Sequence, residues 1–166
     1  MTAFSSVGLK HSAWQTTILV ALGFWLSGSL LLDWVIIPSL YGAGMMGQAS
    51  FATAGYSVFW IFNRIELLCA ALVLTGLLVL RNTGNASRQI GNKVIILSVL
   101  LLTIALIYTY VLTPYMSALG MQLNLFEQAA GMPAGMTQMH EGYWVLEATK
   151  LIMGGTLMGW CLRQQS

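Results

Sequence analysis

The sequence predicts an all-α membrane protein, a four-transmembrane-helix bundle, and two observations support this prediction. Of its 166 residues, 57% are hydrophobic and only 7% are charged, whereas a soluble domain carries about 25% charged residues. Four apolar segments each have about 20 residues or more, which is enough to cross a hydrocarbon core about 30 Å thick. We therefore expect a single integral membrane domain over residues 1–166, surrounded by the lipid bilayer.

The first predicted span covers residues 13–37. It is longer than the apolar core of a cleavable signal peptide, which has about 7–15 residues, so we expect it to stay in the membrane. Pro38 is expected to end this helix, because proline has no backbone N–H to donate. For the uncharged residues 39–56 we expect a loop followed by a short interfacial helix. The second predicted span covers residues 57–80.

Residues 81–93 are rich in Gly, Asn and Ser and predict a loop. The third predicted span, residues 94–113, contains no charged residue and precedes Pro114. A long connection over residues 115–142 leads to the fourth predicted span, residues 143–162.

The basic residues near the ends of the spans predict the orientation. All of them lie on one side, and the loops 39–56 and 115–142 have no lysine or arginine. Basic loops remain in the cytoplasm, so we expect both termini there. The basic residues on this side are Lys10, Arg81, Arg88, Lys93 and Arg163.

Polar residues inside the spans are the first candidate functional site. On a helical wheel, His140, Tyr143, Glu147 and Lys150 fall within roughly 80° of one another. Ionisable groups are costly in hydrocarbon and are functional candidates by default. Three acids and two bases leave a formal charge of −1, which suits proton or metal-cation handling. The alternative is a structural ion-pair network. The expected buried polar cluster, in the outer half of the membrane, comprises Asp33, Asn63, Arg64, Glu66, Glu147 and Lys150.

A second candidate is a metal site in the connection before the last span. Met132, Met136, Met139 and His140 offer thioether sulfurs and an imidazole, which are ligands suited to Cu(I). The alternative is that these methionines are ordinary interfacial apolar residues. The cysteines, Cys69 and Cys161, lie in apolar segments and are expected to be packing residues.

Two parts of the chain echo each other. Residues 35–41 resemble residues 111–117 at an offset of 76, and residues 59–66 resemble residues 143–150 at an offset of 84. We interpret this as duplication of a helix-loop-helix unit, which would give parallel repeats. Chance similarity between apolar segments is the alternative.

Partners and activities can be narrowed further. Gly155 and Gly159 form a small-xxx-small pattern that serves a homodimer or packing within the bundle. The net charge of +2 and the lack of a basic binding pattern argue against nucleic acid. Phosphate-binding, zinc-protease and serine-elbow motifs are absent, so we expect no enzyme and no catalytic residue.

Pro38, Tyr41, Gly47 and Phe51, followed by a span with polar residues and a last helix led by His140, carry a resemblance to a family. The chain resembles the bacterial and organellar four-helix membrane proteins of unknown function related to the eukaryotic transmembrane protein linked to cisplatin resistance. At Tyr41 the family more often has phenylalanine. The resemblance implies a four-helix bundle in the bacterial inner membrane or the thylakoid membrane, and its link to drug and metal resistance favours transport or metal handling.

From the residues we expect a small accessory or assembly subunit of an energy-transducing membrane, bound to a larger complex, because the chain is short and mostly apolar. The alternative is a transporter or copper-handling protein that uses the buried cluster. A membrane redox or haem enzyme ranks third, since His11 and His140 are predicted on opposite sides of the membrane and cannot bind one haem iron together.

Overall fold

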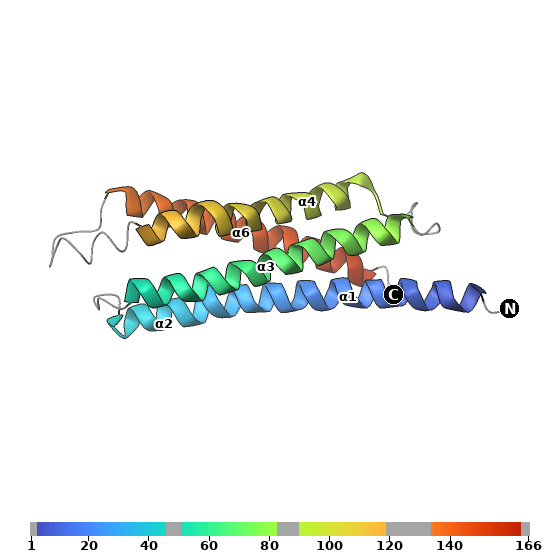
Figure 1. Ribbon diagram of the computed structural model, residues 1–166, viewed down its shortest axis with the longest axis horizontal. Coiled ribbons are helices and arrows are strands. Elements are labelled where there is room, and N and C mark those ends of the chain that lie inside the picture. Colours follow the sequence, from blue (N-terminus) through green and yellow to red (C-terminus); the bar gives the residue numbers. More distant parts are fainter. Residues whose placement is uncertain (1–2, 46–50, 83–89, 119–133, 164–166) are drawn as a thin grey trace.

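The computed structural model describes residues 3–45, 51–82, 90–118 and 134–163. Within these ranges every regular element is a helix (Figure 1). The elements are α1 (Ala3–Leu30), the π-helical segment η1 (Leu31–Ile36), α2 (Ile37–Gly42), α3 (Phe51–Asn82), α4 (Asn92–Ile107), the π-helical segment η3 (Tyr108–Leu112) and α6 (Ala134–Arg163).

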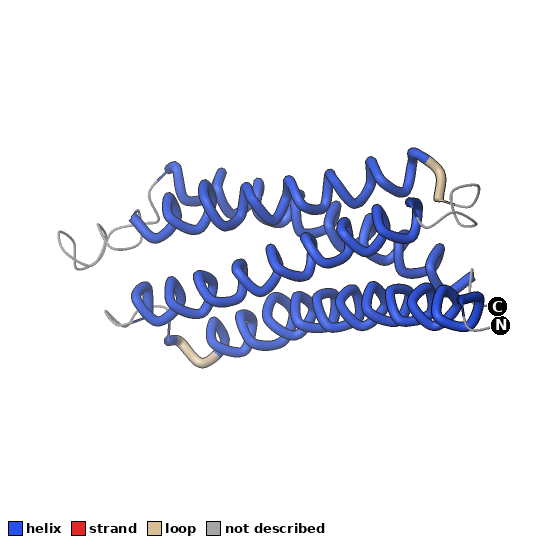
Figure 2. Tube along the Cα trace, turned by 45° about the vertical axis from the view of Figure 1, so that its right-hand side comes forward, coloured by secondary structure: helices blue, strands red, loops and turns tan. Residues whose placement is uncertain are grey.

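In the described part of the chain, four long helices lie side by side. The first is continuous through α1, η1 and α2, and the third continues from α4 through η3 to residue 118. The α1 and α4 helices run opposite to α3 and α6, as Figures 1 and 2 show. Each of α1 and α4 packs against both α3 and α6, so α3 and α6 lie diagonally across the bundle.

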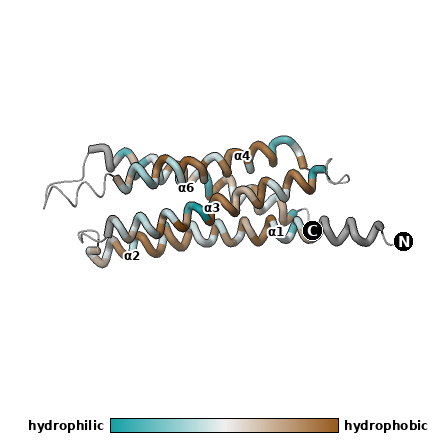
Figure 3. The backbone as a smooth tube through the Cα atoms, viewed as in Figure 1, coloured by the Kyte–Doolittle hydropathy of each residue, from teal (hydrophilic) through white to brown (hydrophobic). Residues whose placement is uncertain are grey.

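Three stretches of helix are long and apolar enough to cross a membrane: Ala13–Leu40, Thr53–Asn82 and Asn92–Ala118. Apolar residues recur along all three in Figure 3. These stretches make the chain a membrane-embedded protein. The α6 helix has 30 residues but is not among them, because Glu147, Lys150 and several glycines and threonines dilute its apolar character.

The expectation that Pro38 ends the first helix is wrong, since the helix continues to Gly42. Pro114 likewise lies within a helix. In both places a π-helical turn comes just before the proline: the N–H of Ile37 donates to the carbonyl of Leu32, and the N–H of Thr113 donates to that of Tyr108. The wider turn gives the proline ring room where an α-helical carbonyl would clash.

The predicted connections are shorter in the structure. Helix occupies Ser39–Gly42 and begins again at Phe51, which replaces most of the loop and interfacial helix expected over residues 39–56; residues 46–50 lie outside the described part. The α6 helix starts at Ala134 rather than at residue 143. Longer helices satisfy backbone hydrogen-bonding groups that a loop near a membrane would leave open.

The apolar core fills the half of the bundle nearest to the start of α1 and the end of α6. It includes Ile18, Leu22, Val73, Leu77 and Leu157. Two glycines allow close helix contact here. A Cβ on Gly76 would lie 2.7 Å from Ile18 Cγ1, and one on Gly154 would lie 2.7 Å from Leu26 Cδ2. The other half of the bundle carries the buried charged residues.

Candidate functional site

Lys150 lies at the centre of a buried polar network. Its Nζ atom is 2.5 Å from Glu66 Oε1 and 2.6 Å from Glu147 Oε2, and all three residues are only 1% exposed. The ammonium group also lies 5.1 Å from the centre of the Tyr108 ring. Glu147 and Lys150 are three residues apart on α6 and therefore share a helix face. One amine is thus held between carboxylates of two helices.

Glu66 receives further donors from α1. Trp25 Nε1 and Ser29 Oγ each donate to Glu66 Oε1 at 2.9 Å, the same oxygen that contacts Lys150. Trp25 and Ser29 are one turn apart, so a single face of α1 supplies both donors. Three donors on one carboxylate oxygen provide the pairing that a buried negative charge requires.

Asp33 and Glu147 are less completely satisfied. Tyr143 donates its hydroxyl to Asp33 Oδ1 at 2.5 Å, and the Tyr108 hydroxyl lies 3.2 Å from Glu147 Oε2. The second oxygens, Asp33 Oδ2 and Glu147 Oε1, are buried without a hydrogen-bond donor. Tyr143 and Tyr108 join the two groups, because the Tyr108 hydroxyl also lies 3.3 Å from the Tyr143 carbonyl oxygen; protonation would turn either free oxygen from an acceptor into a donor.

The formal charge of this network is negative. Asp33, Glu66 and Glu147 contribute three negative charges and Lys150 one positive charge, which gives −2 when every group is ionised. An uncompensated buried charge is costly in a low-dielectric interior. We call these four residues, with the donors Trp25, Ser29, Tyr108 and Tyr143, the buried network.

Arg64 does not belong to the buried network, and the expectation that it is buried is wrong. Its side chain is exposed, and its guanidinium carbon lies 3.5 Å from the centre of the Trp60 ring. At about 100° per residue, Arg64 and Glu66 point in nearly opposite directions from α3. Glu66 faces the bundle, so Arg64 faces outward, and the expected charge of −1 becomes −2.

Asn63 is buried but lies apart from the charged groups. Its Nδ2 atom donates to Thr113 Oγ1 at 2.5 Å, and the Thr109 hydroxyl donates to its backbone carbonyl oxygen at 3.4 Å. If the predicted duplication holds, Asn63 corresponds to Glu147 at the offset of 84 and Thr109 to Asp33 at the offset of 76. Neutral residues would then occupy the positions that match the two carboxyl groups.

Three members of the buried network were not among the candidates from sequence: Trp25, Ser29 and Tyr108. A signal for the first two was present, because Trp25, Ser29 and Asp33 are spaced four residues apart and share a helix face. Tyr108 had no comparable signal, since its span contains no charged residue that would point to its role.

The proposed copper ligands are only partly described. Met132 lies outside the described residues, and Met136 belongs to α6 without a described side chain; Met139 and His140 are half-buried. Among the described residues, no group of three or more His, Cys, Asp or Glu side chains could hold a metal ion. The copper site therefore stays a prediction. Both cysteines are free thiols that belong to or pack against the apolar core.

The glycine pair of α6 has an open surface. A Cβ at either Gly155 or Gly159 would meet no atom within 4 Å, so neither residue serves packing against the other described helices. Gly154, one position earlier, makes that contact instead.

Comparisons of the chain with protein-family models, curated proteins and solved structures find no match in any of the three. The chemistry of the site itself is therefore the guide to function. It consists of one fixed carboxylate, one lysine and two further buried carboxyl groups, each with one oxygen that lacks a donor.

Proposed function

We propose that the protein is a small four-span subunit of an energy-transducing membrane, and that its buried network binds and releases a proton. The observation that carries the proposal is the pair of buried oxygens without a donor, Asp33 Oδ2 and Glu147 Oε1, in one network with a formal charge of −2. A proton on one of these carboxyl groups removes an unpaired acceptor and lowers the net negative charge at the same time.

A proton fits this site better than a larger ligand. The four charged residues are at most 2% exposed, so the network offers little room for a hydrated ion or an organic solute. The described residues also lack a metal-binding group of His, Cys, Asp or Glu. A proton can reach such a site through small movements of hydroxyl groups, and Tyr108 and Tyr143 stand next to both carboxyl groups.

The fourth span in this proposal is α6. It has the length of a span, and its charged residues Glu147 and Lys150 point into the bundle, where protein rather than lipid surrounds them. Arg81, Lys93 and Arg163 lie at the helix ends on one side of the bundle (Figure 1). This supports cytoplasmic termini by the positive-inside rule.

The structure also supports an ancient duplication as part of the proposal. The π-helical turns that end at Ile37 and Thr113 lie at the offset of 76. At the offset of 84, Phe59 and Tyr143 face each other with ring centres 6.1 Å apart, and Glu66 faces Lys150. Equivalent residues that meet across the bundle are what an axis along the membrane normal produces.

The closed network supports the role as an accessory subunit, because the buried charged residues leave little room for a solute. A larger membrane complex or a second copy would pack on the open Gly155 and Gly159 surface of α6. A bacterial inner membrane or a thylakoid membrane would supply the protons, which agrees with the resemblance carried by Pro38, Tyr41, Gly47 and Phe51.

Infrared difference spectroscopy during a pH titration of the purified protein tests the proton site. A protonated carboxyl band should titrate in the parent and should shift or vanish in Asp33→Asn and Glu147→Gln. Glu141→Gln is the matched control, because Glu141 is an exposed acid on the same helix. A parent protein without a titrating carboxyl band, or a band that survives both variants, would contradict the proposal.

Copper handling is the second candidate. Met136, Met139 and His140 are spaced three and four residues apart on α6 and therefore lie on one helix face. This is an arrangement in which sulfur and imidazole groups can converge on one Cu(I) ion. Mass spectrometry of the natively purified protein, for both metals and partner proteins, separates this role from that of an accessory subunit.

A further inference from the structure

An exposed cation lies within a predicted membrane span. Arg64 is eleven residues after Thr53, the first residue of the second apolar stretch, which places its Cα about 16 Å along the helix from that end. At this depth, in the acyl region of the outer leaflet, a charged group on the bundle surface is costly unless it finds an anion or reaches the interface.

The side chain of Arg64 leans toward the outer interface. Its guanidinium carbon lies 3.5 Å from the ring centre of Trp60, which is four residues earlier and therefore one helical turn closer to the outer end. In the described part of the chain both salt bridges belong to Lys150, so none joins Arg64 to a carboxylate. The Trp60 ring covers one face of the guanidinium. The N–H donors lie at the edge of the guanidinium plane, so they can still donate to another group.

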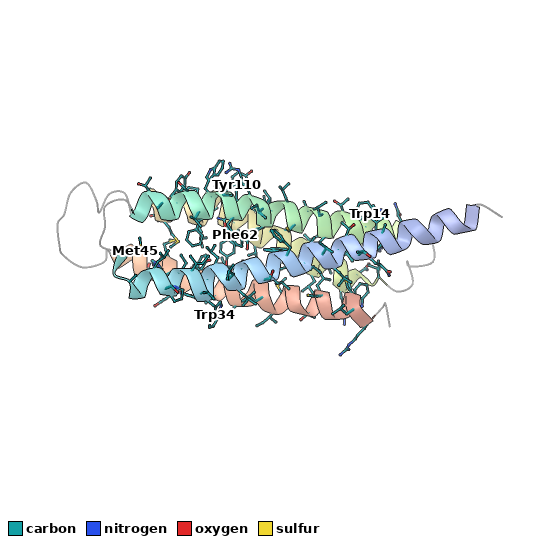
Figure 4. The ribbon with its side chains drawn as sticks, turned by 90° about the horizontal axis from the view of Figure 1, so that it is seen from below. Trp14, Trp34, Met45, Phe62 and Tyr110 are labelled. Carbon is teal, nitrogen blue, oxygen red and sulfur yellow. The ribbon has the colours of Figure 1, made fainter. Side chains whose placement is uncertain are left out.

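Exposed aromatic residues mark the level of Trp60 as interfacial. Trp34 and Trp144 pack edge to face, with ring centres 6.0 Å apart. At the repeat offsets, Trp144 corresponds to Trp60 and Trp34 to Tyr110. Trp34 and Tyr110 project to opposite sides of the bundle (Figure 4), with 63% and 66% of their surfaces exposed, whereas Phe62 points inward. Tryptophan and tyrosine collect at the level of the lipid headgroups.

The surface around Trp60 and the surface around Trp144 differ in one residue. The residue equivalent to Arg64 at the offset of 84 is Ala148. Thus the surface with Trp60 carries a cation, and the surface with Trp144 carries a methyl group at the same position. A cation stacked on an aromatic ring at headgroup level, with its donor edge free, matches a phosphate group in charge and geometry, because guanidinium binds phosphate in a bidentate way.

We propose that Arg64 and Trp60 form a binding site for the phosphate of an anionic phospholipid in the outer leaflet. The lipid would lie along α3 with its acyl chains beside the exposed Leu68 and Leu72 and its phosphate at the level of Trp60. Guanidinium supplies two parallel N–H donors, and Trp60 keeps it in place at the interface. One site is expected per chain.

The test uses the full-length protein purified in mild detergent, stripped of lipid and titrated with an anionic phospholipid while native mass spectrometry counts bound lipids. The parent should bind one anionic lipid at least about tenfold more tightly than Arg64→Gln, since the variant loses the charge-assisted hydrogen bonds to the phosphate. Arg64→Lys should bind with intermediate affinity, and a zwitterionic phospholipid should show a smaller difference. Arg81→Gln is the control at the other end of α3.

A gain-of-function variant separates the loss of the lipid site from misfolding of a variant. Ala148→Arg places a cation four residues after Trp144 and should create a second lipid site with no change at Arg64. Equal lipid binding by the parent and Arg64→Gln, together with no gain in Ala148→Arg, would overturn the proposal. It would also be overturned if Arg64→Gln lost a co-purifying protein while lipid binding stayed unchanged, because the anion would then be a partner's carboxylate.

Discussion

Lys150 and Glu66 meet across the bundle from two helices that run in the same direction, α6 and α3. Their Nζ and Oε1 atoms are 2.5 Å apart, and their residue numbers differ by the repeat offset of 84. An axis along the membrane normal would bring two equivalent residues face to face. Identical charges there would repel each other, so opposite charges at this pair convert an unfavourable contact into an ion pair. Under the proposed duplication, the buried network is therefore asymmetric in charge at this pair of matching residues.

Replacement of Lys150 by methionine should destabilise the protein strongly. The change leaves Asp33, Glu66 and Glu147 without a cation, and loss of one partner of a buried pair costs about 3–5 kcal/mol in soluble proteins, with a smaller cost in a membrane where water can enter. Thermal unfolding in detergent measures the effect. Lys93→Met is the control, because Lys93 is exposed at the start of α4.

Second-site changes should then show which acid depends most on Lys150. Glu147→Gln should restore more stability to Lys150→Met than Glu66→Gln does. Glu66 still accepts from Trp25 and Ser29 in the absence of the lysine, whereas Glu147 retains only the longer contact with Tyr108. A double-mutant cycle measures both couplings. Equal stability of the parent and Lys150→Met would show that the lysine is not held in a buried ion pair.

Much of the helical architecture could be predicted from sequence, because composition and segment length determine it. The effect of the two prolines could not be predicted, because the rule that proline ends a helix applies to an α-helix. The π-helical turns before Pro38 and Pro114 make room for the proline rings, and these turns depend on the whole helix. The helices also extend beyond the predicted spans for a similar reason. Hydropathy marks where lipid begins, and the helices of this chain continue beyond that point.

The candidate site could be predicted in part. Charged residues in apolar segments pointed to Asp33, Glu66, Glu147 and Lys150, which the structure brings together. Spacing alone could not place Arg64, because a helix of unknown rotation leaves either Arg64 or Glu66 free to face the bundle. Donors such as Tyr108 depend on which helices become neighbours, and that information is not local in the sequence.

Topology can be tested with reporter fusions. Fusions at Asn85 and Ser166 should report a cytoplasmic location, and a fusion at Gln128 should report the outer side, because the basic residues lie near the first two positions. A cytoplasmic signal at Gln128 would reverse the orientation and would also place Arg64 in the inner leaflet.

Copper binding is expected to depend on the segment before and at the start of α6. Titration of the purified protein with Cu(I) should show binding that is lost when Met132, Met136 and Met139 are replaced by leucine and His140 by glutamine. Replacement of Met45 by leucine serves as the control, since this exposed methionine follows α2 on another connection. Unchanged binding in the fourfold variant, or no binding in the parent, would exclude this segment as a copper site.

The glycines of α6 should respond differently to substitution by alanine. Gly154→Ala should lower the thermal stability, by about 1–3 kcal/mol if the helices cannot shift, because the new Cβ would lie 2.7 Å from Leu26 Cδ2. Gly155→Ala should not lower the stability of the isolated chain and should raise it by up to about 1 kcal/mol, since nothing lies within 4 Å and alanine favours a helix over glycine. If α6 docks on a second copy, Gly155→Leu should instead reduce dimerisation in a cross-linking assay. Equal effects of the two alanine variants would argue against the packing described for Gly154.

Loss of the two tyrosine hydroxyls should have unequal effects on the buried network. Tyr143→Phe removes the 2.5 Å contact to Asp33 Oδ1 and leaves a buried carboxyl group with neither of its oxygens paired to a donor, which typically costs about 1–3 kcal/mol. Tyr108→Phe removes a longer contact of 3.2 Å from an oxygen that Lys150 still pairs, so its cost should be smaller. Asp33→Asn in the Tyr143→Phe background should recover stability, because the change removes the buried charge that the tyrosine hydroxyl pairs with in the parent. Thermal unfolding of the four proteins compares these effects, and a larger loss in Tyr108→Phe than in Tyr143→Phe would contradict the order of the two contacts.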